Sequence, residues 1–402
     1  MTLLRKIMCI FGKALATLLL LVAMVFIASS VSPIYDFRAP RPFSGPDIFN
    51  PYRDLDTTLH WKRANFHTHT RVKGLLNECE VWPKDTYDTL RRFGYDIITF
   101  SNHNEITPHP VDPALQVNVY EHGYSVVKFH KLVFGSRKVK HYDALAPFLI
   151  SQKQFQLDYL GKGSDFIQMN HPYRVLWTRK SHLEALSGYE IMELDSGKGT
   201  ENEYWDWALS AGHYSFGLAN DDLHFPYKTY KTAVRCNFLQ CPSERYEDIR
   251  ETLLGGCYYA MRIPDYGHGD WKVKHEKNRH LPYVRNIGLT DSTVFIRLSV
   301  PADSIRLIGQ DHRTLARAEC CDNLSYTMLP EDSYGRFTAW FPEGEVIYSN
   351  PFARYDASVA ATPADNTPQK VNIPLTILYN LLVLLVFAGA VTLLCLLFIK
   401  KK

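Results

Sequence analysis

The stretch Asn65-Phe66-His67-Thr68-His69-Thr70 closes the first strand that the sequence predicts, residues 64–67. Residues two apart on an extended chain point to the same side, so both imidazoles can reach one metal ion. Alone, a His-x-His pair is weak evidence, because two histidines on a surface or in a core are the commoner explanation. The pair therefore indicates a metal site only if further ligands follow at the ends of other strands.

Other apolar runs along the chain also end on polar side chains. Residues 97–104 read Ile-Ile-Thr-Phe-Ser-Asn-His-Asn, and residues 166–172 and 216–224 follow the same arrangement. In a parallel α/β barrel or sheet, the carboxyl ends of the strands form one face, and that face builds the active site. The side chains that these runs and the segment between them supply are His103, Glu121, His130, His171, Asp222 and His224.

Residues 59–263 alternate predicted strands with predicted helices, which indicates an α/β fold with a mostly parallel sheet. The strand candidates are residues 64–67, 95–101, 124–134, 165–169, 189–194 and 215–219. The helix candidates are residues 84–93, 143–160, 201–211 and 243–254. After Pro264, short alternating runs separated by turn residues predict a small antiparallel β unit that resembles a sandwich.

The motifs in residues 59–263 resemble those of the polymerase and histidinol phosphatase (PHP) family of metallophosphoesterases. The first family motif, His-x-His, matches His67 and His69, and the second, usually Thr-Asp-His, reads Ser101-Asn102-His103. Glu121 best matches the bridging glutamate and His130 the next histidine. The remaining two motifs match His171-Pro172 and Asp222-Leu223-His224. The resemblance implies a distorted PHP-like (β/α)7 barrel.

The resemblance also implies a cluster of two or three divalent metal ions. One ion would be held by His67, His69, Glu121 and Asp222, a second by Glu121, His130 and His171, and a third by His103 and His224. Imidazole and carboxylate ligands together suit Zn, Mn or Fe. The third ion is the open one, because Asn102 replaces an acid of the family and residues 71–75 lack a histidine that some relatives have.

The implied activity is hydrolysis of a phosphate ester by a metal-bound hydroxide, since ions at such a site lower the pKa of bound water toward ~7. Arg174 and Arg71 could bind the phosphate, although each could equally be a solvated loop charge. His122 and Asp221 stand beside two of the expected ligands and would replace them if the register differed by one residue. Glu193 could bind substrate hydroxyls or orient a ligand, although such acids more often cap the next helix.

Both ends of the chain are apolar. Residues 7–28 follow Arg5 and Lys6, and residues 373–399 precede three lysines. Each run is long enough for a transmembrane helix, although the first could be a cleaved signal peptide. The flanking basic residues predict that both termini are cytoplasmic and that the part between them is extracytoplasmic, periplasmic or extracellular.

These features divide the chain into six predicted segments. They are an N-terminal transmembrane anchor (1–32), a linker (33–58), a PHP-like metallohydrolase domain (59–263), a β-sandwich-like domain (264–356), a second linker (357–372) and a C-terminal transmembrane helix with a basic tail (373–402). In an oxidising compartment, Cys236 and Cys241 are a plausible disulfide pair.

The composition limits the partners. The 402 residues include 45 basic and 42 acidic side chains, so the net charge of +3 gives no electrostatic reason to expect nucleic acid. The expected partners are the lipid bilayer and a phosphorylated small molecule or envelope-associated substrate. Two other functions stay open: a metal-dependent hydrolase of an amide or lactone, and a non-catalytic metal-binding envelope protein.

Overall fold

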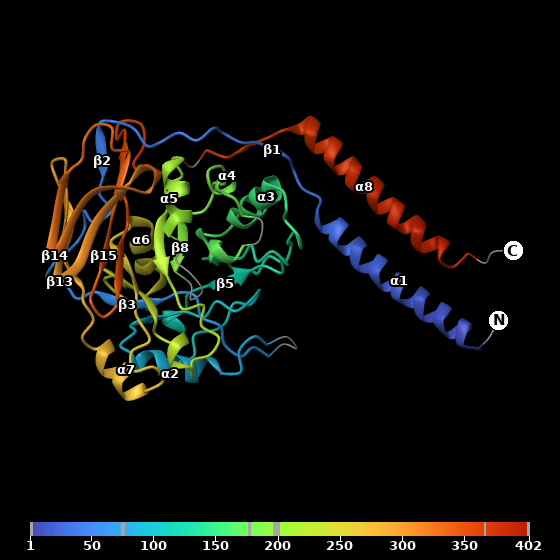
Figure 1. Cartoon of the computed structure of the whole chain (residues 1–402), viewed down its shortest axis with the longest axis horizontal. Helices are drawn as coiled ribbons and strands as arrows, with labels where there is room; N and C mark the ends of the chain where they lie inside the picture. The colour runs from blue at the N-terminus through green and yellow to red at the C-terminus, as the bar shows by residue number, and fades with distance from the viewer. Residues whose placement is uncertain (1–2, 74–76, 176–177, 196–201, 366, 400–402) are drawn as a thin grey trace.

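Two sheets with helices beside them form the body of the molecule, and two apolar helices extend from it (Figure 1). The computed structural model describes residues 3–73, 77–175, 178–195, 202–365 and 367–399. The mixed α/β class that the sequence predicts is confirmed, while the arrangement of the strands differs from the prediction in two respects given below.

The smaller sheet has five strands in the order β5-β6-β7-β8-β9. Their bounds are β5 (Val119–His122), β6 (Lys131–Phe134), β7 (Phe166–Met169), β8 (Ile191–Asp195) and β9 (Phe216–Ala219). Every residue of these strands is buried, which explains why they appear in the sequence as continuous apolar runs. The strands β7, β8 and β9 are parallel, but β6 is antiparallel to both of its neighbours.

The predicted strand at residues 124–134 is therefore wrong over most of its length. Strand β5 ends at His122, and β6 begins only at Lys131. Between them, Tyr124 donates its backbone N–H to Asp143 at 2.5 Å, and Lys128 has a φ of 59°. This left-handed residue interrupts an extended chain, so the segment connects two antiparallel strands as a loop.

The larger sheet has eleven strands, eight of them in the order β12-β13-β15-β16-β11-β10-β3-β4. The bounds are β2 (Asp47–Phe49), β3 (Lys62–Asn65), β4 (Ile97–Ile98), β10 (Arg235–Leu239), β11 (Tyr258–Arg262), β12 (Val284–Thr290), β13 (Thr293–Gly309), β14 (Arg313–Thr327), β15 (Tyr334–Trp340), β16 (Val346–Ser349) and β17 (Phe352–Tyr355). The strands after Pro264 pair antiparallel, as predicted. They continue the sheet that contains β3 and β4, and the predicted domain boundaries stay predictions.

The strands do not close into the predicted barrel within the described residues. Instead, two isolated parallel bridges join the sheets, one between Thr68 and Leu223 and one between His103 and Glu121. Strands β3 and β4 are parallel and very short, so the hydrogen bonding between them does not continue into a closed barrel. Both bridges lie at the ends of strands that carry the polar motifs. The open arrangement therefore still brings those motifs together.

Six helices belong to the body. They are α2 (Pro83–Arg92), α3 (Ile150–Gly161), α4 (Lys180–Leu183), α5 (Asn202–Ser210), α6 (Tyr246–Gly255) and α7 (Trp271–Asn278), counted over the described residues. Helix α3 starts seven residues later than predicted. The expected first turns, residues 143–149, instead contact the end of the N-terminal helix, where Leu145 N–H donates to Ser29 Oγ at 3.2 Å.

The two terminal helices, α1 (Leu3–Ser29) and α8 (Ile373–Leu396), lie side by side, with both chain ends at the same end of the pair (Figure 1). Both are long and apolar enough to cross a membrane. Where they leave the body, β1 (Tyr35–Asp36) pairs with β18 (Lys370–Val371), and Tyr379 Oη donates to Ser30 O at 2.9 Å. The basic tail, residues 400–402, lies outside the described residues.

All eight cysteines are free, so the suggested disulfide between Cys236 and Cys241 is wrong. Cys236 lies in β10, and Cys241 follows the end of that strand. An extended chain advances by about 3.3 Å per residue, which holds two residues five apart well beyond disulfide range.

Candidate metal centre

The carboxylate of Glu121 lies at the centre of a buried cluster of imidazoles. Strand β5 places this side chain on the inner side, where it is 1% exposed. Its Oε2 atom lies 2.9 Å from His103 Nε2, 3.1 Å from His69 Nε2 and 3.3 Å from His67 Nε2. One oxygen atom of Glu121 thus faces three ring nitrogens from the ends of two different strands.

The other oxygen of Glu121 faces the second half of the cluster. Its Oε1 atom lies 3.2 Å from His130 Nδ1 and 3.2 Å from His171 Nε2, and it accepts a hydrogen bond of 2.9 Å from Asn170 Nδ2. His130 precedes β6, and His171 follows β7. The carboxylate therefore connects five imidazoles, which is the geometry expected of a bridging ligand.

Asp222 closes the side of the cluster that is nearest β3. Its Oδ1 atom lies 3.3 Å from the Nε2 atoms of both His67 and His69, and 3.5 Å from His224 Nδ1. Its neighbour Asp221 turns away and accepts backbone N–H groups of residues 233–235. Asp222, and not Asp221, thus faces the cluster.

His122 likewise points away from the cluster, because successive side chains of β5 lie on opposite faces of the sheet. Its Nε2 atom lies 2.9 Å from the carbonyl oxygen of Tyr142. Burial, aided by the charge of Lys131, lowers the pKa of His122 to about 2, so this imidazole is neutral. His122 and Asp221, the two residues that a shift of one position would have made ligands, therefore lie outside the cluster.

The cluster favours negative charge on its carboxylates. Burial alone would raise the pKa of Glu121, but His103, His67 and His130 outweigh burial and hold this pKa well below its usual range. The same balance, set by burial and then by His67 and His69, holds the pKa of Asp222 well below its usual range. Two ionised carboxylates among imidazoles form a donor set suited to divalent cations.

The backbone is strained at two residues of the cluster. His171 has a φ of 27° and Asp222 a φ of 46°, so both lie in the left-handed region although neither is glycine. Such conformations cost roughly 1–3 kcal/mol each and persist where surrounding contacts impose them, often at functional sites. In these conformations His171 faces Glu121, and Asp222 faces His67 and His69.

Glu193 of β8 contacts two residues of the cluster and orients them. Its Oε1 atom lies 2.9 Å from His67 Nδ1, and its Oε2 atom accepts the backbone N–H of His171 at 2.9 Å. A carboxylate on the far nitrogen of a histidine fixes the ring and leaves the other nitrogen free to bind a metal. Glu193 is therefore a positioning residue for His67.

We expect Glu193→Gln to weaken metal binding by about 10- to 100-fold, because an amide orients His67 less firmly than a carboxylate does. Competition with a chromogenic chelator measures this affinity. The matched control is Glu190→Gln at the residue before β8, whose Oε2 accepts Ile167 N–H at 2.9 Å. Equal affinities for the two variants would contradict the role of Glu193.

Glu78 is a member of the cluster that the sequence analysis missed. Its Oε2 atom lies 3.1 Å from His103 Nε2 and 3.5 Å from His224 Nε2, although the side chain is half exposed. It stands on a loop and not at a strand end, so only its place nine residues after His69 could have drawn attention to it. Glu78 supplies a carboxylate beside the two histidines that were assigned to a third ion.

The two arginines proposed for substrate binding differ in position. Arg174 Nη1 forms a short ion pair with Asp222 Oδ2, so its guanidinium reaches the edge of the cluster. The guanidinium of Arg71 lies 5.1 Å from the ring centroid of Trp82. Of the two, Arg174 lies beside the cluster, and the substrate-binding role of both arginines stays a prediction.

Among the described residues, three sets of donor atoms in the cluster are close enough to hold a metal ion, each set lying within 4.8 Å. They are His67, His69, Glu121 and Asp222; His69, Glu78 and His103; and His103, Glu121 and His130. The first contains the four residues that the family resemblance assigns to one ion. His171 and His224 are the remaining expected ligands and lie beside Glu121 and Asp222. That any of these residues binds an ion stays a prediction.

No family model and no curated protein match the chain. Among solved structures, it is similar to a two-domain protein containing a predicted PHP-like metal-dependent phosphoesterase from Bacteroides vulgatus. The two share 15% identity with a TM-score of 0.38, over 79% of this chain and 100% of the other. It is also similar to the lesion-specific endonuclease EndoQ from Pyrococcus furiosus, with 12% identity and a TM-score of 0.33, over 48% and 56%. These likenesses are too remote to decide an activity.

Proposed function

We propose that this protein is a membrane-anchored, metal-dependent hydrolase that cleaves a phosphate ester. The observation that carries the proposal is the buried carboxylate of Glu121, which faces five imidazoles through its two oxygens. A structural metal site needs only about four ligands. A cluster of six imidazoles and three carboxylates offers more donors than one such ion can use, and it therefore favours a catalytic site with several ions.

Different residues of the site would bind the metal ions and the phosphate. Divalent ions at such a site polarise a phosphoryl oxygen and supply a water-derived nucleophile at neutral pH. Glu121 would be a ligand shared between ions, and His67, oriented by Glu193, would hold one ion with His69 and Asp222. Arg174 would bind a phosphate oxygen, because guanidinium pairs with oxyanions through two donors.

The proposal is tested with the purified, metal-loaded full chain on phosphomonoesters, phosphodiesters, amides and lactones. We expect release of phosphate or of an alcohol from a phosphate ester. Cleavage of only an amide or a lactone would favour the alternative hydrolase. If no substrate is cleaved, and His67→Ala removes the metal yet preserves the cellular phenotype, the protein is a non-catalytic envelope protein.

Arg174→Ala should raise the KM for the phosphate ester about 10- to 100-fold, because it removes charge-assisted hydrogen bonds worth about 1.5–3 kcal/mol. Steady-state kinetics measure this, and metal content is checked in parallel because Arg174 also contacts Asp222. Arg179→Ala, an exposed arginine five residues further on, is the matched control. An unchanged KM in a variant that retains its metal would remove Arg174 from the substrate site.

We propose further that α1 and α8 anchor the body to a membrane and that the body is extracytoplasmic. The helices run side by side with both termini at one end, so a single bilayer would accommodate the pair (Figure 1). Tyr142 Oη donates to Val31 O at 2.7 Å, and Gln152 Nε2 donates to Ser30 O at 3.1 Å. These contacts hold the body close to the outer end of α1, which favours a substrate at or near the bilayer.

The exposed Cys320 on β14 reports the side of the membrane on which the body lies. We expect a membrane-impermeant maleimide to label intact cells that carry the protein about as fully as permeabilised cells. The double variant Cys320→Ser/Cys321→Ser serves as the control, since it removes both thiols of this strand and leaves the exposed Cys9 and Cys395 of the terminal helices to give the background labelling. Labelling that requires permeabilisation would place the body in the cytoplasm.

A further inference from the structure

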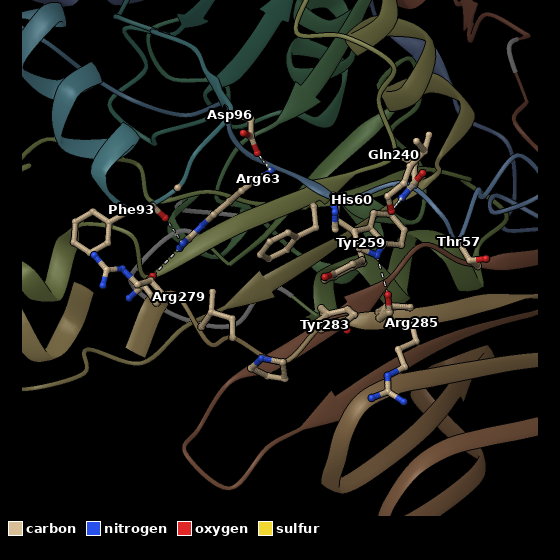
Figure 2. A pocket seen from close by; sticks show the side chains of 18 of the residues that line it. Thr57, His60, Arg63, Phe93, Asp96, Gln240, Tyr259, Arg279, Tyr283 and Arg285 are labelled. Atoms are coloured by element: carbon tan, nitrogen blue, oxygen red, sulfur yellow. Dashed lines mark hydrogen bonds between the residues drawn. The ribbon is translucent and has the colours of Figure 1, made fainter. Parts of the chain in front are cut away.

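A cavity of about 790 Å³ lies at the other end of β3 from the metal cluster (Figure 2). Trp61 and Arg63 at the start of this strand line it, whereas His67 and His69 follow the strand's end. Four residues of extended chain separate Arg63 from His67 by about 13 Å. The volume falls in the range of small-molecule sites, which often lie where two parts of a fold meet.

The lining of the cavity is strongly cationic. Five arginines line it, namely Arg63, Arg91, Arg92, Arg279 and Arg285, whereas Asp96 is the single carboxylate among the lining residues that the structure describes. Asp96 is already engaged, because its Oδ2 accepts the backbone N–H of Arg63 at 2.9 Å. Arg279 pairs with Glu276 at 3.1 Å on the surface, and such exposed pairs exchange partners at little cost. The lining therefore favours an anionic ligand.

Aromatic rings form the middle of the cavity. Figure 2 shows Tyr259 near its centre, with Arg63 and Arg279 on one side and Arg285 on the other. The ring of Tyr259 lies 4.9 Å from that of Trp61 and 5.1 Å from that of Phe238, measured between centroids. Next to them, Tyr283 is 44% exposed. Tyr259 itself is fully buried, but the rings of Trp61, Phe238 and Tyr283 are at least partly exposed and can pack against a planar ring.

We propose that this cavity binds a small molecule in which a phosphate is joined to a planar ring, the chemistry of a nucleoside monophosphate. The phosphate would lie among the arginines, which bind oxyanions through paired donors. The ring would pack against Tyr283 and Trp61, which are at least partly exposed. This site is separate from the metal cluster and does not depend on the activity proposed for it.

The test is calorimetric titration of the full chain, in detergent and treated with EDTA, with AMP, adenosine and inorganic phosphate. EDTA removes metal, so phosphate cannot bind through ions at the cluster. We expect AMP to bind roughly 10- to 100-fold more tightly than adenosine or phosphate alone, because only AMP offers both groups. No binding of AMP, or equal binding of AMP and phosphate, would overturn the proposal.

Variants locate the binding site. Arg279→Ala and Arg285→Ala should each weaken AMP binding roughly 10-fold or more, and Tyr283→Ala should weaken it less because the contacts to the phosphate remain. Arg317→Ala is the matched control, an exposed arginine of β14 that pairs with Glu319. AMP binding that survives both arginine variants but is lost in His69→Ala would belong to the cluster and would also overturn the proposal.

Discussion

Replacing Glu121 with alanine is expected to lower the metal content below one ion per chain and to reduce hydrolysis by about 100- to 1,000-fold or more. The reason lies in its position, since its two oxygens face three imidazoles on one side and two on the other. Loss of one histidine leaves other donors in place, whereas loss of Glu121 removes the group that the ions would share.

Elemental analysis of the purified full chain measures the metal, and an initial-rate assay on a phosphate ester measures the activity. Glu319→Ala is the control, because Glu319 is an exposed carboxylate of β14 paired with Arg317. Glu121→Gln separates charge from shape, since the amide keeps the size of the side chain but cannot bridge two cations. A Glu121→Ala variant with unchanged metal content would contradict the bridging role.

The cluster residues that follow strands were predictable, because a short stretch of sequence shows an apolar run that ends in a histidine or an acid. His103, His171 and Asp222 all do so, and the structure brings them to one place. Glu78 follows no strand and reaches the cluster through the path of a loop. That path depends on contacts distant in sequence, which local patterns do not encode.

Glu193 illustrates a second limit. Its position in a predicted strand was apparent, but an acid there could equally cap the following helix. Its role depends on β8 lying beside β7, which places its carboxylate between His67 and the backbone of His171. Only the pairing of strands decides between the two readings.

Strand pairing was also the main source of error in the predicted fold. The antiparallel strands were recognised, yet β10 and β11 were not expected, and these two strands join β3 to the rest of the eleven-stranded sheet. The sequences of these two strands, which include Cys236 and Tyr259, show no distinctive alternation of polar and apolar residues. Connections between distant strands follow from tertiary packing, so the continuous sheet was not predictable from periodicity alone.

A buried ion pair connects α5 to that sheet. Asp206 of α5 accepts hydrogen bonds from Arg336 Nε at 2.8 Å and from Tyr334 Oη at 3.0 Å, and it also pairs with His312. Both Asp206 and Arg336 have fully buried side chains. Arg336 lies in β15, so the pair holds the helix against the antiparallel strands.

Asp206→Ala is expected to lower the free energy of unfolding by about 3–5 kcal/mol, because it leaves the guanidinium of Arg336 buried without its partner. Urea unfolding of the full chain in detergent, followed by tryptophan fluorescence, measures the change. Asp303→Ala, at an exposed aspartate of β13, should change stability by at most about 0.5 kcal/mol. A similar small change for Asp206→Ala would mean that the pair contributes little to holding α5.

The effect of Asp206→Ala should also depend on pH. Burial would raise the pKa of Asp206, but Arg336 and His312 outweigh burial and lower this pKa below its usual range. A carboxyl whose pKa is lowered by folding stabilises the fold above its unfolded-state pKa, and this contribution is lost as the pH falls through the folded-state pKa. The difference between wild type and variant should therefore be complete at pH 7 and should shrink below about pH 4, whereas a difference independent of pH would indicate lost packing instead of lost charge.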